Sequence, residues 1–155
     1  MIFKLASKVI ANTLKKILPS IISDTQSAFV HGRLITDNIL VAFEAMHHIS
    51  QKKTSKKGTM ALKLDTSKVY DRVEWVCLEK IMEKLGFNQC WRRLIMRCVT
   101  MVSYSFRING KVYGSVQPSR GIRQGDPLSP YLFLIVVEGL SSLIRKSMEV
   151  GTLEG

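Results

Sequence analysis

Acidic side chains are scarce in this 155-residue chain, which has 12 aspartates and glutamates against 23 lysines and arginines. The formal net charge of +11 favours polyanionic partners, with nucleic acid ahead of acidic membrane surfaces. A generic basic surface is the alternative. Hydrophobic residues still form 46% of the chain, which is enough for a core and excludes wholesale disorder. The length fits one domain or part of a larger one.

Cysteine is also rare: Cys77, Cys90 and Cys98 form no CxxC motif, and an odd number of thiols cannot all pair. We expect buried thiols in a reducing compartment, and no histidine spacing indicates zinc. Long apolar runs are missing as well, because residues 131–143 are interrupted by Glu138 and are too few to span a bilayer. We therefore expect an intracellular protein without a membrane partner, in the nucleus or the cytoplasm.

Lysines and apolar residues at helical spacing predict an amphipathic helix over residues 3–18, which Pro19 ends. The lack of acids there is also typical of a transit peptide, but the segment has no arginine and few serines. A second helix, capped by Thr36 or Asp37, has an apolar side. Residues 51–58 then form a lysine-rich loop that is either simply solvated or a phosphate contact.

Residues Met60–Asp65 alternate apolar and polar side chains, which predicts a β-strand with the carboxylate of Asp65 at its end. Such a carboxylate is well placed to hold a hard metal ion, and a capping or strand-end aspartate is the alternative. Alternating residues on both sides of Asn109-Gly110 predict a hairpin, because this dipeptide suits a tight turn between strands.

Three more helices are predicted in the second half of the chain. One covers residues 74–85 and is ended by Gly86, and the next covers residues 88–98 with an asparagine cap. A long apolar helix follows, with Pro127 or Pro130 in its first turn. Helices combined with one strand and one hairpin indicate an α+β fold.

Three segments, residues 26–40, 64–75 and 120–133, resemble in wording and order the reverse transcriptase of plant LINE-type (non-LTR) retrotransposons. The third, RGIRQGDPLSPYLF, is close to a family signature by itself. The resemblance implies a partial right-hand polymerase, with fingers over residues 1–59 and palm over residues 60–155. In such a fragment, an incomplete antiparallel palm sheet packs on helices.

The resemblance also assigns roles to the second segment. Asp65 is the catalytic carboxylate and a ligand of Mg²⁺, and the backbone carbonyl of Thr66 is a further metal ligand. Tyr70 packs under the incoming sugar and excludes a ribose 2′-hydroxyl, with core packing as the alternative. Val69 stands where the family has a small residue.

The resemblance further implies that, in the third segment, Gln124 touches the incoming nucleotide and Gly125 lets the backbone approach the template. Three arginines are assigned to the template or its phosphates: Arg33, Arg120 and Arg123. For Arg120 and Arg123 the alternative is a solvated loop, and for Arg33 it is an ion pair with Asp37.

LINE-type enzymes carry an aromatic-Ala-Asp-Asp turn that supplies the remaining metal carboxylates, and this chain has no two adjacent acidic residues. We therefore expect a fragment of an RNA-directed DNA polymerase that is inactive alone. The implied partners are an RNA template, a DNA primer and deoxynucleotides. A non-catalytic module that binds RNA or RNA–DNA hybrid and a non-functional retroelement relic are the alternatives.

Overall fold

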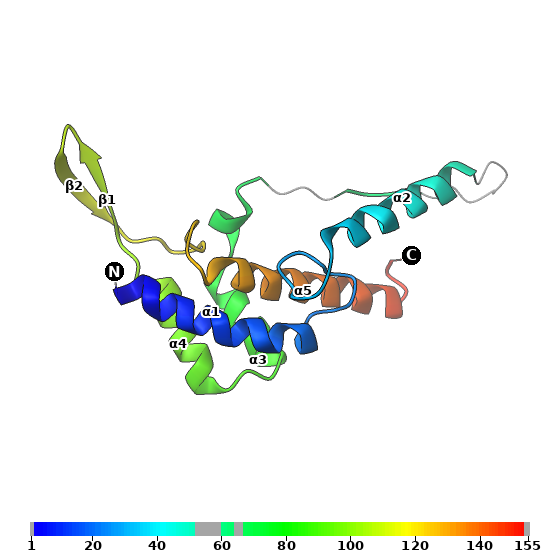
Figure 1. The fold of residues 1–155 in the computed structure, drawn as a ribbon, viewed down its shortest axis with the longest axis horizontal. Helices are drawn as coiled ribbons and strands as arrows, with labels where there is room; N and C mark the ends of the chain where they lie inside the picture. Colours follow the sequence, from blue (N-terminus) through cyan, green and yellow to red (C-terminus); the bar gives the residue numbers. More distant parts are fainter. Residues whose placement is uncertain (1, 52–59, 64–66, 154–155) are drawn as a thin grey trace.

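The computed structural model describes residues 2–51, 60–63 and 67–153. In chain order, its elements are α1 (Ile2–Ile21), α2 (Ile35–Gln51), the 3₁₀ helix η1 (Val69–Arg72), α3 (Trp75–Lys84), α4 (Gln89–Thr100), β1 (Tyr104–Ile108), β2 (Lys111–Val116) and α5 (Ser129–Glu149). Helices and one antiparallel pair agree with the predicted α+β composition. Figure 1 shows α5 in the middle of the molecule, with α2 and the hairpin extending away from it.

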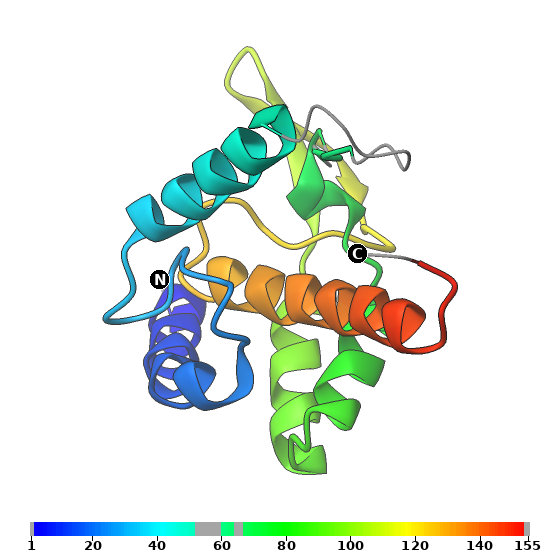
Figure 2. The same ribbon diagram turned by 90° about the vertical axis from the view of Figure 1, so that its right-hand side faces the viewer.

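The core lies where α1, α3 and α4 meet α5. Both views in Figures 1 and 2 place α3 and α4 on the side of α5 opposite to α2 and the hairpin. The largest fully buried apolar side chains come from all four helices: Leu14, Leu18, Leu78, Met82, Ile95, Leu132, Leu134 and Ile135. Gly139 brings α3 close to α5, because a Cβ at that position would lie 2.5 Å from Cδ1 of Ile81.

Helix α1 continues through Pro19 to Ile21, so the prediction that Pro19 ends it is wrong. Proline removes one backbone donor from a helix and costs about 3 kcal/mol in its interior. Leu18, just before the proline, and Ile22, three residues after it, are buried, with 1% and 4% exposed, and the amide of Ile22 donates to the carbonyl of Leu18 at 2.9 Å. Burial of these side chains offsets the cost of the proline.

The predicted ends of the later helices are confirmed. At the end of α3, Gly86 has a φ of +81°, and the amide of Phe87 donates to the carbonyl of Met82 at 3.0 Å, as in a Schellman cap. Asn88 caps α4 by accepting the Cys90 amide at 2.8 Å. Pro130 lies in the first turn of α5.

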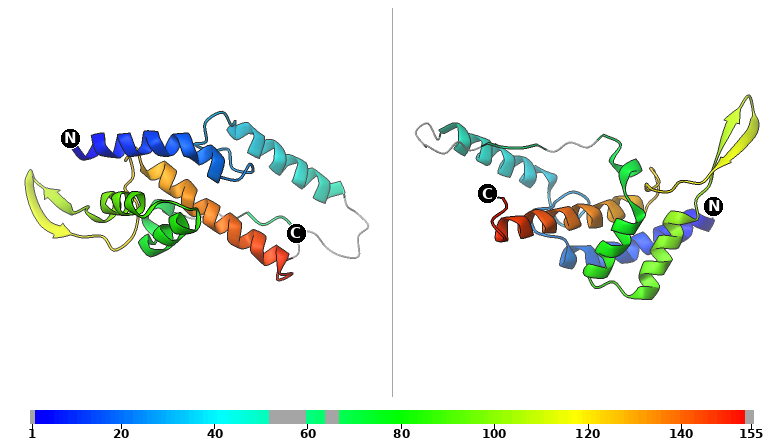
Figure 3. Two further views of the ribbon diagram at one scale, coloured as in Figure 1. Left: turned by 90° about the horizontal axis from the view of Figure 1, so that it is seen from below. Right: turned by 180° about the vertical axis from the view of Figure 1, so that it is seen from behind.

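The hairpin is confirmed at Asn109-Gly110, where φ values of +49° and +81° fit a type I′ turn. Every residue of β1 and β2 is exposed, so the sheet is not packed on helices as predicted. Helix α2 likewise buries none of its residues. Figure 3 shows the hairpin and α2 reaching towards different ends of the molecule.

A strand is predicted over Met60–Asp65, but residues 60–63, the part of this segment that the structure describes, do not form one. Residues 60–63 are exposed, without regular secondary structure, and outside the two-stranded sheet. Alternation alone does not make a strand, because its backbone groups need a neighbouring strand as partner. The end of this segment, including Asp65 and Thr66, and the lysines of the 51–58 loop lie outside the described residues.

Candidate nucleotide and template site

Backbone hydrogen bonds join η1 to the loop of residues 120–126, which precedes α5. The amide of Ile122 donates to the carbonyl of Tyr70 at 2.9 Å, and the amide of Gly121 donates to the carbonyl of Val73 at 2.8 Å. The half-buried indole of Trp75 donates to the carbonyl of Gly121 at 2.7 Å. Figure 3 shows η1 in green beside the gold segment that leads into α5. Two of the three motifs therefore form one surface.

Gly121 makes this close approach possible. Its φ is +92°, and a Cβ there would lie 3.2 Å from both the Cα and the carbonyl oxygen of Asp71. Only a residue without a side chain fits between these backbone atoms without strain. Sequence reasoning missed this role of Gly121, although a glycine within a motif is the signal that indicates such a close approach.

Tyr70 is half-buried in η1, and its ring meets the ring of Phe133 from α5 edge to face, with centroids 5.4 Å apart. An edge-to-face pair adds about 0.5–1.5 kcal/mol beyond the area that it buries. Tyr70 therefore packs against the core with part of its ring, as the alternative interpretation predicts. Its sugar-gating role stays a prediction.

The functional side chains predicted in the 120–126 loop point to solvent. Arg123, Gln124 and Gly125 are exposed, and nothing lies within 4 Å of a Cβ placed on Gly125, whose φ is +76°. Arg120 forms an exposed ion pair with Glu74 at 3.4 Å, which is weakly stabilising. Within the described part of the chain, Arg123 has no ion-pair partner. These side chains are therefore accessible from solvent.

Asp126, which sequence reasoning missed, fixes the loop from inside. This carboxylate is 8% exposed, accepts the hydroxyl of Ser7 in α1, and accepts the amide of Leu128 at 2.9 Å. The hydroxyl of Ser129 donates to the carbonyl of Arg123 at 2.5 Å. The loop is therefore held in one shape while its outer side chains remain accessible.

A cavity of about 190 Å³ lies between this loop, α4 and the start of α1. Its lining residues include the basic Arg120 and Arg123 and the acidic Asp71 and Asp126. Cys98 also lines it, and burial, with a smaller effect of the negative charge of Asp126, raises the pKa of its thiol. This thiol is neutral at physiological pH and is not an activated nucleophile.

Arg33 holds its own loop together. Its Nη1 donates to the carbonyls of Ser23 and Gln26 at 2.6 and 2.7 Å, and its Nη2 pairs with Asp24 at 3.0 Å. The acidic partner is therefore Asp24, in place of the predicted Asp37. These contacts give Arg33 a structural role, and its contact with a template stays a prediction.

The described residues contain no group of three or more histidine, cysteine, aspartate or glutamate side chains arranged to hold a metal ion. The predicted ligands Asp65 and Thr66 lie outside those residues. Over the same described residues, no helix has the length and apolar character needed to cross a bilayer.

Comparison with known proteins gives consistent matches. The family model described as reverse transcriptase (RNA-dependent DNA polymerase) matches residues 1–153. An uncharacterized mitochondrial protein of Arabidopsis thaliana is 60% identical over 50 residues, which are 32% of this chain and 41% of that protein. The transposon TX1 uncharacterized 149 kDa protein of Xenopus laevis is 28% identical over 146 residues, 94% of this chain and 11% of that protein.

A retrovirus-related Pol polyprotein from the type-1 retrotransposable element R2 of Popillia japonica is 29% identical over 94 residues, which are 61% of this chain and 16% of that protein. Each of these matches covers less than half of the relative's own length.

Proposed function

The chain belongs to the reverse transcriptase (RNA-dependent DNA polymerase) family, and we propose that it supplies the nucleotide- and template-facing loop of an RNA-directed DNA polymerase. The hydrogen bonds from Ile122 to Tyr70 of η1 and from Gly121 to Val73, directly after η1, carry this proposal, because they join two family motifs into one fixed surface. A site that is rigid before its ligand arrives loses less entropy on binding.

Each exposed group of the loop has a chemical task in this proposal. Gln124 offers amide donors and an acceptor to the incoming nucleotide, and Gly125 lets the template approach the backbone. Arg120 and Arg123 meet phosphates through charge-assisted hydrogen bonds. Tyr70, held by its ring contact with Phe133, limits the space at the sugar.

The architectural part of the proposal assigns residues 1–59 to the fingers and residues 60–155 to the palm of a right-hand polymerase. Polymerases use divalent metal ions, which stabilise charge on the transferred phosphoryl group when bound. Asp65 and the carbonyl of Thr66 remain the proposed ligands. Because Mg²⁺ needs several well-placed oxygens, we propose that this chain does not polymerise alone.

Binding of an RNA–DNA hybrid tests the loop. We expect Arg120→Gln with Arg123→Gln to lower the salt dependence of binding by about 1–2 units of the log–log slope, near 0.9 per phosphate contact. The matched control is Arg93→Gln with Arg97→Gln, which removes the same charge from the exposed side of α4. Equal effects of the two pairs of substitutions, measured by fluorescence anisotropy, would contradict the proposal.

Primer extension tests the predicted inactivity. We expect no extension of a DNA primer on an RNA template by the 155-residue chain with Mg²⁺ and deoxynucleotides. Extension that disappears in Asp65→Ala would show that the chain is a working polymerase and that the proposal of inactivity is wrong.

A non-catalytic nucleic-acid-binding module is the second candidate. The observation that favours it is the set of exposed cationic side chains, such as Arg123, without a partner in the described part of the chain. Salt-dependent RNA binding without extension supports this module. A chain that neither binds nor unfolds cooperatively supports a relic.

A further inference from the structure

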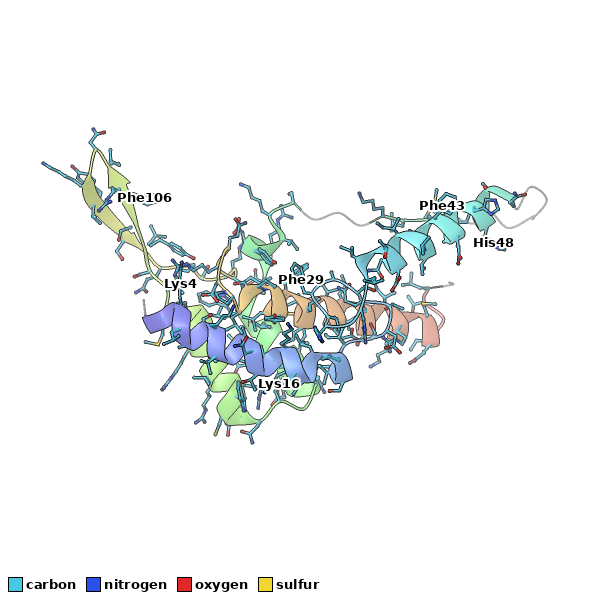
Figure 4. The ribbon with its side chains drawn as sticks, viewed as in Figure 1. Lys4, Lys16, Phe29, Phe43, His48 and Phe106 are labelled. Atoms are coloured by element: carbon cyan, nitrogen blue, oxygen red, sulfur yellow. The ribbon has the colours of Figure 1, made fainter. Side chains whose placement is uncertain are left out.

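Helix α1 carries a second cationic surface that the proposed site does not use. Lys4, Lys8, Lys15 and Lys16 are all exposed, and α1 contains no acidic residue. Within the described part of the chain, none of these four ammonium groups forms an ion pair. Their charge is therefore available to a ligand. Figure 4 labels Lys4 and Lys16 at separate places along the helix.

The spacing of the lysines forms a row. At about 100° per residue, Lys4, Lys8 and Lys15 fall within about 40° of one another around the helix axis. At a rise of about 1.5 Å per residue, the row is about 16 Å long. Each strand of a duplex carries one phosphate per about 3.4 Å of the duplex axis, so the row spans the axial rise of about five phosphates of one strand.

The row ends in a hollow with polar walls. Asn12, Lys15, Lys16, Pro19 and His31 line an open hollow of about 600 Å³. Four of these five side chains can donate hydrogen bonds, and none of the five is a carboxylate. This set of groups suits an anion.

The loop that forms the other wall of the hollow is fixed in place. Val30, next to His31, is 5% exposed in the core, and Arg33 binds two carbonyls of the same loop. The nearby acidic residue Asp24 is paired with Arg33 at 3.0 Å. This wall of the hollow is thus held by contacts within the protein.

The row also begins at the candidate site. Ser7, which lies between Lys4 and Lys8 in the chain, donates its hydroxyl to Asp126 of the 120–126 loop. Phe3 lines the same cavity as Arg120 and Arg123. A strand held by the loop can therefore continue along α1 and meet cationic groups over its whole path.

We infer that the lysine row and the hollow of α1 bind the phosphodiester backbone of the nucleic acid that the 120–126 loop engages. The inference rests on the proposed function for the choice of an RNA–DNA hybrid as ligand. A lipid surface is the competing partner, because Leu5 and Val9 are exposed on the same helix. A row with a concave end favours a linear polyanion, whereas a membrane needs a broad apolar face.

The test measures binding of an RNA–DNA hybrid of about 20 base pairs. This hybrid is longer than the lysine row, which spans about five phosphates of one strand. The test variant combines Lys4→Gln, Lys8→Gln and Lys15→Gln. The control combines Lys80→Gln, Lys84→Gln and Lys146→Gln, which removes equal charge from exposed positions on α3 and α5. Fluorescence anisotropy over a range of salt concentrations measures affinity and slope, and circular dichroism checks that each variant keeps its helix content.

We expect the log–log salt slope of the α1 variant to fall by about 2–3 units, near 0.9 per lost phosphate contact, and that of the control by less than about 1. Equal slopes for the two variants would overturn the inference. So would loss of binding to phosphatidylserine vesicles with hybrid binding unchanged, which would make α1 a lipid-binding surface. If the α1 variant matches the control while the variant of Arg120 and Arg123 loses binding, the inference fails and the proposed function stands.

Discussion

Replacement of Gly121 by alanine tests the contact between η1 and the 120–126 loop. With a φ of +92°, an alanine would adopt a left-handed backbone, which costs a residue with a Cβ about 1–2 kcal/mol. The new methyl group would also lie 3.2 Å from two backbone atoms of Asp71, which have no rotamer by which to move aside. Displacement of packed backbone typically adds about 1–3 kcal/mol.

We therefore expect Gly121→Ala to lower the free energy of unfolding by about 2–4 kcal/mol. This range allows for a stabilisation of about 0.4–1 kcal/mol, because alanine lowers the conformational entropy of the unfolded chain. Urea denaturation, followed by tryptophan fluorescence, measures the change and also reports on Trp75, whose indole donates to this residue. The loss would be a large share of the stability of a typical domain.

Gly125→Ala is the matched control, because its φ is +76° but nothing lies within 4 Å of the added Cβ. We expect it to cost about 1 kcal/mol, which is the backbone contribution alone. If both substitutions cost the same, the steric contact with Asp71 does not exist and the two motifs are not held together as described.

Three further outcomes are expected. Ser7→Ala should lower the free energy of unfolding by about 1–2 kcal/mol, because the buried carboxylate of Asp126 loses a donor; a change below about 0.5 kcal/mol would contradict this hydrogen bond. Leu132→Ala should cost about 2–5 kcal/mol, and Leu143→Ala, at a 65% exposed position of the same helix, less than about 0.5 kcal/mol by thermal denaturation. Cys77 and Cys90 are exposed, so the expectation of buried thiols is wrong for these two; because the raised pKa of Cys98 leaves less thiolate, iodoacetamide at pH 8 should modify Cys98 after them, and mass spectrometry showing the reverse order would refute this.

The features that were predicted correctly depend on short-range signals. The Asn109-Gly110 turn, the glycine end of α3 at Gly86 and the cap at Asn88 each act within a few residues. Such signals need no knowledge of the rest of the fold. The chemistry of the local backbone was sufficient for these elements.

The features that were predicted wrongly depend on residues far apart in the chain. Pro19 stays inside α1 because the flanking side chains reach a core built by α3, α4 and α5. The segment at residues 60–63 has strand-like alternation but no described partner strand. The hydrogen bond from Ser7 to Asp126 joins residues 119 positions apart, which no local pattern indicates.

In the candidate site, too, short-range signals were visible in the sequence and contacts between distant residues were not. The roles predicted for the exposed Gln124 and Gly125 stay predictions, while the hydrogen bonds from the loop to the segment of η1 became visible only in the folded chain. The resemblance assigns Arg33 to the template, which stays a prediction, whereas its hydrogen bonds to two backbone carbonyls of its own loop became visible only in the folded chain. A motif arginine that holds its own loop together therefore cannot be distinguished, from sequence alone, from one that binds a ligand.

Photo-crosslinking tests the central claim, that the 120–126 loop faces the nucleotide and the template. An RNA–DNA hybrid with 4-thiothymidine at the primer end is irradiated with the chain, and mass spectrometry identifies the modified peptide. Our account predicts crosslinks at the loop, reduced in Gln124→Ala and unchanged in Gln117→Ala, an exposed control nearby. Crosslinks confined to α3 or the hairpin, with the loop unmodified, would contradict it.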